Sequence, residues 1–262
     1  MIFAVYFGGY VFSVLFVASM GLCVFELYRA LRTKGLICTE WPVWLSMVIS
    51  IPLFMEIKTS ITLILSIAAG AVLMITVMIM IRSQPRLDDL LASCLPLVAV
   101  LLPGMCMLGL NKLPDRVIQV PMILLAFGVP LFGDMIAYFI GKRFGNRKLC
   151  PVVSPNKTVE GAVAGLLGSV LFALLLWIAV KELTYQDHTV FHLWNYLLVG
   201  LIGGIAGQAG DLFASMIKRY CEVKDYGSIF PGHGGMMDRL DSTYWAAVVV
   251  YIFINCALPG LQ

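Results

Sequence analysis

Residues 215–241 read SMIKRYCEVKDYGSIFPGHGGMMDRLD and separate two strongly apolar stretches of the chain. The segment, called the charged block below, holds eight charged residues and one histidine. Charged side chains are costly beside a bilayer, so a dense polar segment between apolar ones indicates a site rather than an ordinary surface. The apolar flanks of the charged block therefore decide the fold class.

Composition predicts an integral membrane protein. The chain has 262 residues, of which 60% are hydrophobic and only 13% are charged, and its mean hydropathy is +0.93. A soluble domain carries roughly 25% charged residues, about twice the fraction found here. The net charge of +3 says little about partners, so the distribution of charge matters more.

The seven cysteines are scattered, odd in number and without a C-x-x-C pair. This pattern argues against both a disulfide framework and a zinc site. Cys221 lies in the charged block, where a role near chemistry and a role as a small hydrophobe are both open, the second being the commoner. We expect no cleavable signal, because a basic leading region and a small-residue cleavage site are both missing.

Apolar runs long enough to span a bilayer predict an all-α, polytopic helical bundle of about eight transmembrane helices, with seven to nine as the range. The first run could form two short spans or one tilted helix, and the second is short and contains two prolines. The eight candidate spans are 2–28, 41–55, 60–81, 91–110, 117–141, 159–180, 194–217 and 242–258.

The basic residues predict the orientation of these spans. Fourteen of the 18 Lys and Arg residues lie in alternate connections, which are 29–40, 82–90, 142–158 and 218–241. Cytoplasmic loops carry the excess of Lys and Arg, so these four loops are expected in the cytoplasm and both termini outside. We expect one continuous membrane domain, with N-terminal helices in 1–115 and, in 116–262, the helices that carry a cytoplasm-facing site.

Two polar clusters lie before the charged block. Asp134 interrupts an apolar run and Tyr138 follows at i+4 on the same helix face, which suits either a ligand site or a hydrogen bond between helices. Further along, Ser154 followed by Pro155 predicts an N-cap and the start of a helix, whose free N–H groups suit a phosphate. Lys157 adds a cation there, although an ordinary capped helix beside lipid headgroups explains the motif equally well.

The next cluster descends into the bundle. Asp211, Ser215 and Lys218 are spaced to share one helix stripe, with Arg219 beside them. Interface anchoring explains the two cations but not the buried acid.

Within the charged block, Gly234 and Gly235 follow His233 and would let the backbone approach a ligand closely. A lone histidine is more often a hydrogen-bonding group than a metal ligand. Mg²⁺ is usually held by one or two carboxylates with phosphate and water oxygens, and Asp211 with Asp238 could supply that pair. Acids, cations and a glycine turn on one face suit phosphoryl or nucleotidyl transfer, and no Walker A, kinase or GxGxxG pattern is present.

The charged block resembles the signature of the phosphatidate cytidylyltransferase, or CDP-diacylglycerol synthase, family. The matching pattern is Ser215-x-x-Lys218-Arg219, Lys224-Asp225, Gly227, Phe230-Pro231-x-His233-Gly234-Gly235 and Asp238-Arg239-x-Asp241. Two earlier segments also resemble this family, namely Asp134-x-x-Ala137-Tyr138-x-x-Gly141 and Ser154-Pro155-Asn156-Lys157-Thr158-x-Glu160-Gly161. The resemblance runs from 134 to 241.

This resemblance implies transfer of CMP from CTP to phosphatidic acid, giving CDP-diacylglycerol and pyrophosphate for phospholipid biosynthesis. It implies Mg²⁺ held by Asp211 and Asp238, with room for a second cation, and phosphate contacts from Lys218, Arg219, Lys224 and Arg239. A phosphomonoester is already a competent nucleophile, so His233 is expected to hydrogen-bond phosphate rather than act as a base. The remaining candidate residues are Asp225 and Asp241 for catalysis, and Asp134, Tyr138, Ser154, Asn156, Lys157, Thr158, Glu160, Ser215, Gly234 and Gly235 for substrate binding.

The expected partners are CTP, phosphatidic acid and membrane lipids in a bacterial inner membrane, without nucleic acid, and a homo-oligomer is left open. One alternative is a CTP-dependent lipid kinase, or a CTP transferase acting on another lipid phosphate. A second is a transporter whose intramembrane acids bind cations. A transporter would place polar residues along the full depth of the bundle, often with repeated halves. Neither feature is evident in the sequence.

Overall fold

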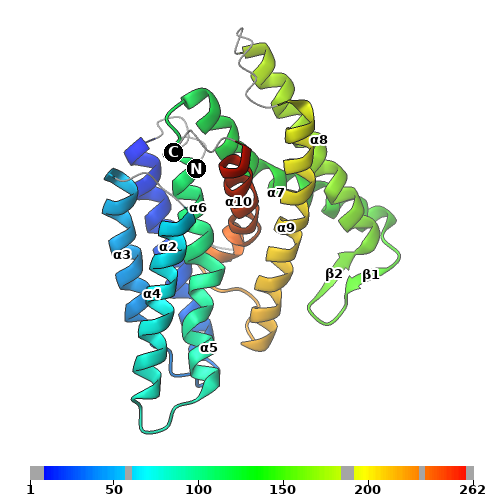
Figure 1. The fold of residues 1–262 in the computed structure, drawn as a ribbon. Coiled ribbons are helices and arrows are strands. Elements are labelled where there is room, and N and C mark those ends of the chain that lie inside the picture. The colour runs from blue at the N-terminus through cyan, green and yellow to red at the C-terminus, as the bar shows by residue number, and fades with distance from the viewer. Residues whose placement is uncertain (1–8, 57–60, 184–191, 230–233, 258–262) are drawn as a thin grey trace. The chain divides into compact units, whose positions relative to one another are not determined.

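The computed structural model describes residues 9–56, 61–183, 192–229 and 234–257, and its elements are almost all helices (Figure 1). The side chains of 52–56 are not described. In order, the elements are α2 (Gly9–Arg32), α3 (Trp41–Glu56), α4 (Ile61–Met80), α5 (Leu87–Pro96), η1 (Leu97–Leu101), α6 (Leu102–Leu110), α7 (Arg116–Phe144), β1 (Lys148–Cys150), β2 (Ser154–Thr158), α8 (Val159–Leu183), α9 (Leu193–Tyr220) and α10 (Met237–Ala257).

The prediction of an all-α polytopic membrane protein is confirmed. Because α5, η1 and α6 form one continuous stretch, Leu87–Leu110, the described residues contain eight helical segments, one for each predicted span. By length and composition, six described helices could cross a membrane, and the start of α3 is a shorter apolar helix. The first predicted span is a single helix from Gly9 onward.

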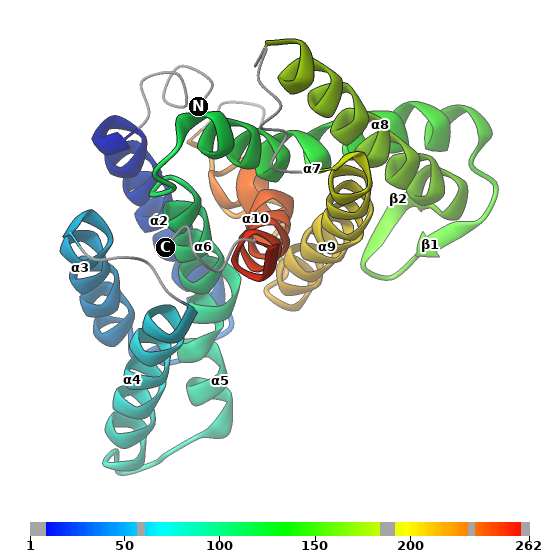
Figure 2. The same cartoon turned by 45° about the horizontal axis from the view of Figure 1, so that its top comes forward.

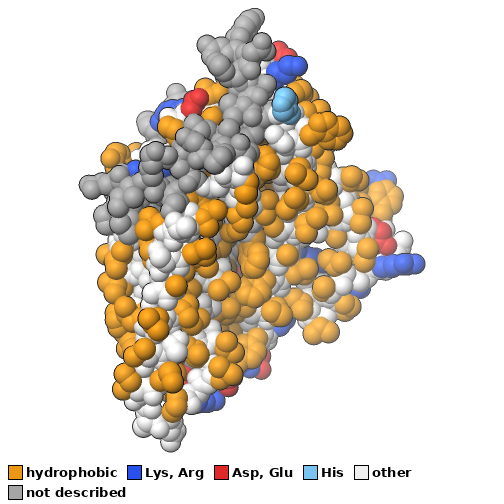
Figure 3. Space-filling model, in the orientation of Figure 1, with side chains coloured by type: hydrophobic (Ala, Val, Ile, Leu, Met, Phe, Trp, Pro, Cys, Tyr) orange, Lys and Arg blue, Asp and Glu red, His pale blue; other side chains and the backbone are white. Residues whose placement is uncertain are grey.

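Apolar side chains cover much of the face seen in Figure 3. Leu65, Leu167 and Val14 are more than half exposed, and each lies on a long apolar helix. An exposed apolar surface of this extent would be an aggregation liability in water but is suited to hydrocarbon. The surface therefore agrees with the composition in identifying a membrane protein.

The long helix Leu87–Leu110 contains a local widening at η1, a π-helical turn between Pro96 and Pro103. Proline has no N–H to donate and its ring crowds the preceding turn. A π-turn is one of the ways in which a helix accommodates such an interruption. The chain thus crosses this segment without a break.

By the density of internal contacts, the chain divides into two compact units, each described here by itself. The first unit comprises Met1–Lys112, Ile217–Leu240 and Gln262, and the second comprises Leu113–Met216 and Asp241–Leu261. Whether the whole chain acts as one continuous membrane domain stays a prediction.

In the first unit, α3, α5, η1 and α6 pack on α2, and α4 packs on α3, α5 and α6 (Figures 1 and 2). The core includes Phe12, Phe16 and Tyr28, which are at most 1% exposed. The Tyr28 hydroxyl donates to the backbone oxygen of Ser93 at 2.9 Å, which satisfies its polar end inside the core. The buried Asp89 carboxylate accepts the backbone N–H of Ile37 at 2.9 Å and so fixes the connection between α2 and α3.

The second unit is held by close packing of α7 on α8. A side-chain carbon at Gly165 would lie only 2.9 Å from the backbone oxygen of Gly133, so the two helices meet almost backbone to backbone. Nearby, the buried Ser169 hydroxyl donates to the Val129 oxygen at 2.9 Å. Small residues and interhelical hydrogen bonds are the usual means of association between membrane helices.

The predicted helix start at Ser154 and Pro155 is wrong. Residues 154–158 form β2, which pairs antiparallel with β1 in the register Lys148 with Thr158 and Cys150 with Ser154. Strand pairing engages the backbone here, so α8 begins four residues later than predicted. Thr158 is the actual capping residue, since its hydroxyl accepts the N–H of Gly161 at 3.1 Å.

The α7–α8 contact predicts the effect of adding one methyl group. We expect Gly165→Ala to destabilise the protein by about 1–3 kcal/mol, because the methyl group overpacks a backbone contact. Gly70→Ala is the matched control, since nothing lies within 4 Å of its added carbon in α4. Thermal unfolding in detergent measures both; equal melting temperatures would contradict the close contact.

Candidate active site

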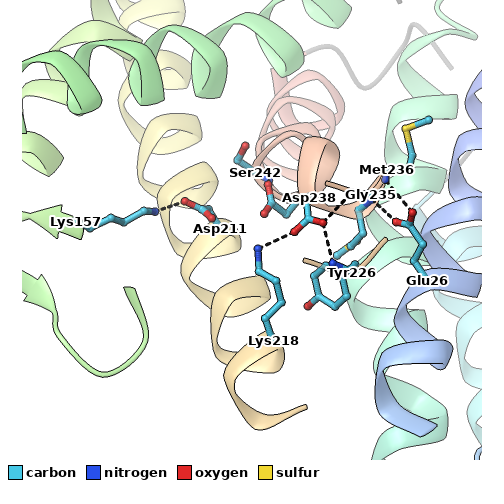
Figure 4. Close-up of polar contacts among 11 residues, drawn as sticks. Glu26, Lys157, Asp211, Lys218, Tyr226, Gly235, Met236, Asp238 and Ser242 are labelled. Atoms are coloured by element: carbon cyan, nitrogen blue, oxygen red, sulfur yellow. Dashed lines mark hydrogen bonds and ion pairs between the residues drawn. The ribbon is translucent and has the colours of Figure 1, made fainter. Parts of the chain in front are cut away.

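The candidate residues form two polar clusters, one in each unit (Figure 4). The first is the Asp238 cluster, which consists of Lys218, Tyr226, Gly235 and Asp238. The second is the Asp211 cluster, which consists of Asp134, Lys157, Asp211 and Ser242. Each is described separately.

The Asp238 carboxylate accepts hydrogen bonds from three donors. One oxygen accepts the Lys218 ammonium at 2.7 Å, and the other accepts the N–H groups of Tyr226 at 2.9 Å and Gly235 at 3.0 Å. The side chains of Asp238 and Lys218 are only 10% and 15% exposed. Charge-assisted hydrogen bonds in such a poorly solvated place are strong, so the carboxylate is held in one orientation.

Helix ends favour these two charges. Asp238 lies in the first turn of α10, where the helix dipole stabilises an anion. Lys218 lies in the last turn of α9, where the dipole stabilises a cation. Lys218 also lies over the ring of Tyr226, with 5.5 Å between the ammonium nitrogen and the ring centroid. The local fold therefore supports the ion pair from both sides.

The glycine turn before α10 wraps around the same carboxylate. Gly234 has a backbone φ of +81°, a conformation that residues with a side chain rarely adopt. Gly235 is buried, and its N–H points at Asp238. Within the first unit the glycine backbone therefore approaches the Asp238 carboxylate closely, and its approach to a ligand stays a prediction.

The other predicted residues of the charged block differ in exposure. Arg219, Lys224, Asp225 and Arg239 are exposed. Asp241 is buried, and its carboxylate accepts the N–H of Ser242 at 2.7 Å. Ser215 is partly buried on α9. His233 lies outside the described residues, so its role stays a prediction.

The Asp211 cluster joins residues that are far apart in the sequence. Lys157 on β2 forms an ion pair with Asp211 on α9, and both side chains are about one quarter exposed (Figure 4). Asp134 on α7 lies within electrostatic range of both and accepts a hydrogen bond from Ser242. The β1–β2 hairpin, which the sequence did not predict, is what carries Lys157 to these acids.

The other predicted site residues in α7, β2 and the start of α8 mostly contact neighbouring parts of the protein. The Glu160 carboxylate accepts the N–H groups of Asn146 and Arg147 and so closes the start of the hairpin. Tyr138 is 61% exposed, and Lys142 lies over its ring. The remaining candidates range from buried Thr158 through partly buried Ser154 to exposed Asn156.

A metal would have to be held by few protein ligands. Over the described ranges, no group of three or more His, Cys, Asp or Glu side chains could hold a metal ion. Carboxylates are nevertheless the donors that Mg²⁺ prefers, and one or two suffice when substrate phosphates complete the shell. Asp134 and Asp211 are two such acids in one unit, and Asp238 is a third in the other. The donor chemistry therefore fits Mg²⁺.

The cysteine of the charged block is a packed thiol. Cys221 is 2% exposed, and burial raises its pKa. Burial likewise raises the pKa of Cys38 to about 11. A thiol with a raised pKa is mostly protonated at neutral pH and is a poor nucleophile. The interpretation of Cys221 as a small hydrophobe is the one that its surroundings favour.

Sequence reasoning missed Glu26 on α2. Its carboxylate is 2% exposed and accepts the N–H groups of Met236 and Met237 at the start of α10. A single acid inside the first apolar run was the signal that could have revealed it.

The two lysine–carboxylate pairs of the first unit should differ in strength. We expect Lys218→Met to destabilise the protein by about 1–3 kcal/mol, because it leaves a poorly solvated carboxylate uncompensated. In Lys218→Met with Asp238→Asn, the loss should be less than additive. Lys34 and Glu222 form the control pair at 2.5 Å, since Glu222 is 79% exposed there. Thermal unfolding of both double-mutant cycles checks this, and equal coupling would contradict it.

Comparison with known proteins agrees with this chemistry. Over 132 residues, the chain is 43% identical to the phosphatidate cytidylyltransferase of Staphylococcus saprophyticus and 42% identical to those of Staphylococcus haemolyticus and Staphylococcus aureus. These alignments cover 50% of this chain and 48% of each relative, so the matched part spans about half the length of the curated relatives. The model of the Cytidylyltransferase family matches residues 1–257. Because that match takes in both polar clusters and every helix that the structure describes, the chain belongs to the Cytidylyltransferase family.

Proposed function

We propose that this chain transfers CMP from CTP to phosphatidic acid, giving CDP-diacylglycerol and pyrophosphate. The family and the names of its relatives support nucleotidyl transfer to a lipid phosphate. The observation that carries the proposal is the pairing of a poorly exposed carboxylate with a lysine in each unit, Asp238 with Lys218 and Asp211 with Lys157.

These pairs are suited to an exchange of partners. Without substrate, each lysine neutralises its carboxylate. A triphosphate brings oxygens that a lysine ammonium can contact, and its accompanying cation brings a charge that a carboxylate can accept. Every charge then keeps an opposite partner, so the desolvation penalty of an unpaired ion is avoided. Lys157 and Lys218 would thus bind phosphate oxygens when Asp211 and Asp238 turn to the cation.

Asp211 and Asp238 are the residues that we propose hold Mg²⁺, with Asp134 as a neighbour of Asp211. Bound to CTP, Mg²⁺ would draw negative charge from the triphosphate and so favour displacement at the α-phosphorus. The contribution of each carboxylate to Mg²⁺ binding is tested by the variants below.

The bond changes follow from the substrates. A phosphate oxygen of phosphatidic acid bonds to the α-phosphorus of CTP, the bond from that phosphorus to the α,β-bridging oxygen breaks, and pyrophosphate leaves with the electron pair. Arg219, Lys224 and Arg239 are exposed cations that would balance the phosphate charge. Because the attacking phosphate is already anionic, His233 is assigned a hydrogen bond to phosphate.

The site is proposed to face the cytoplasm of a bacterial inner membrane. The loops that carry Lys157, Lys218 and Lys224 belong to the set with the excess of basic residues. CTP is a cytoplasmic metabolite, and the lipid substrate would enter from the adjoining leaflet. This orientation brings both substrates to the same side.

Labelled CTP tests the reaction type directly. Purified protein with Mg²⁺ and phosphatidic acid should move label from the α-phosphate of CTP into lipid, while label at the γ-phosphate should leave in pyrophosphate. Thin-layer chromatography of the extracted lipid measures both. Lipid labelled only from the γ-phosphate would identify the kinase alternative and contradict the proposal. Ion flux in sealed vesicles without CTP would instead favour the transporter.

The metal assignment predicts the behaviour of two variants. We expect Asp211→Asn and Asp238→Asn each to lower kcat by about a hundredfold or more, the usual cost of removing a group that stabilises developing charge. Asp88→Asn is the control, because Asp88 is 65% exposed on α5. Near-normal turnover of Asp211→Asn and Asp238→Asn at saturating Mg²⁺ would contradict their role, provided that membrane insertion is equal.

A further inference from the structure

Glu26 is a buried acid that the proposed reaction does not use. It lies on α2, within a helix apolar enough to span the membrane, and is 2% exposed. A buried carboxylate is costly unless strong donors surround it. The identity of those donors therefore indicates what Glu26 does.

The donors are the first amides of α10. The two Glu26 carboxylate oxygens accept the N–H of Met236 at 3.1 Å and the N–H of Met237 at 2.9 Å (Figure 4). The first N–H groups of a helix have no partner inside it, and its dipole attracts negative charge. Glu26 thus caps α10 from a helix about 210 residues earlier in the chain.

The cap adjoins the Asp238 cluster. The N–H of Gly235 donates to Asp238, and the next two amides donate to Glu26. Three consecutive amides are therefore shared between two carboxylates, which fixes the peptide planes of the turn. If Glu26 were removed, that turn and its hydrogen bond to Asp238 would lose a restraint.

Two glycines of the charged block are shaped to receive Glu26. An added side-chain carbon at Gly227 or at Gly235 would overlap the Glu26 carboxylate. Gly227 follows Tyr226, whose N–H is another donor to Asp238. Glu26 therefore lies close to both residues whose N–H groups donate to Asp238, namely Tyr226 and Gly235.

The turn that follows α2 contacts the other end of the segment between α9 and α10. The Thr33 hydroxyl has two backbone acceptors in reach, the Ala30 oxygen at 2.7 Å and the Cys221 oxygen at 3.1 Å. Lys34 pairs with Glu222 at 2.5 Å. The hydrogen bond from Lys34 lowers the pKa of Glu222. The segment between α9 and α10 is thus tied near one end to α2 and near the other to the turn that follows α2.

We propose that Glu26 is a positioning residue for Asp238: by capping α10 it sets the glycine turn that aims the Asp238 carboxylate at its ligand. The role in catalysis rests on the proposed function, whereas the positioning itself is a property of the protein without substrate. A merely structural acid would affect stability alone.

Two measurements on Glu26→Ala test this role. Hydrogen–deuterium exchange of the amides of Tyr226 and Gly235, the donors to Asp238, should accelerate at least tenfold. The Mg²⁺ concentration for half-maximal activity should rise at least tenfold, with a smaller change in KM for phosphatidic acid. Glu26→Gln keeps one acceptor oxygen and should fall between Glu26→Ala and the wild type.

Asp89→Asn is the matched control. Asp89 is also a buried acid of the first unit, 1% exposed, but it binds the N–H of Ile37. Its substitution should lower the melting temperature and accelerate exchange near Ile37, without changing the Mg²⁺ dependence or exchange at Gly235.

A double-mutant cycle adds an independent readout. Gly227→Ala should accelerate exchange at Tyr226 strongly in the wild-type background, where the methyl group meets the Glu26 carboxylate. It should have a smaller effect in Glu26→Ala, where that carboxylate is gone. Equal effects in both backgrounds would contradict the contact.

The outcomes separate this inference from the proposed function. If the wild-type protein transfers no CMP, the proposed function is overturned. The hydrogen–deuterium exchange results would still test whether Glu26 positions Asp238. Unchanged exchange at Tyr226 and Gly235 in Glu26→Ala overturns the positioning even if the wild type is fully active. A lower melting temperature with unchanged exchange and Mg²⁺ dependence also overturns it.

Discussion

The ion pair between Lys218 and Asp238 is the interaction on which the first unit's site depends. The carboxylate sits at the start of α10 and the ammonium at the end of α9, so each helix end favours the charge that it carries. The glycine turn, the Tyr226 amide and the Glu26 cap all serve to hold that carboxylate in place. In a chain with so few charges, several restraints thus converge on one acid.

In the second unit, a poorly exposed carboxylate is also neutralised by a lysine, but the lysine comes from a different kind of element. Its acid, Asp211, is neutralised by Lys157, which arrives on a strand rather than on a helix. Close packing of α7 on α8 places Asp134 beside the pair, and the hairpin between these helices carries the lysine. Backbone contact at Gly165 is thus more than a packing detail, because it sets the distance between the helices that frame the cluster.

Most of the fold could be predicted from the sequence, because each membrane span is recognisable from its own run of apolar residues. All eight predicted spans correspond to helices, and the charged residues of interest were identified as clusters. The hairpin was missed because Ser154 and Pro155 suit a helix start as well as a strand, and the pairing of 148–150 with 154–158 is what decides between them. Glu26 was missed because its partners, the amides of Met236 and Met237, are backbone groups far away in the sequence. Such partners leave no pattern in the sequence, so the lone acid in the first apolar run was the one available signal.

The most direct test of the account is an experimental structure of the protein with Mg²⁺ and a non-reactive CTP analogue. The exchange of partners predicts that the Lys218 ammonium leaves Asp238 for a phosphate oxygen, while the N–H groups of Tyr226 and Gly235 keep their hydrogen bonds to that carboxylate. An analogue bound elsewhere, with the Lys218–Asp238 pair intact, would contradict the account.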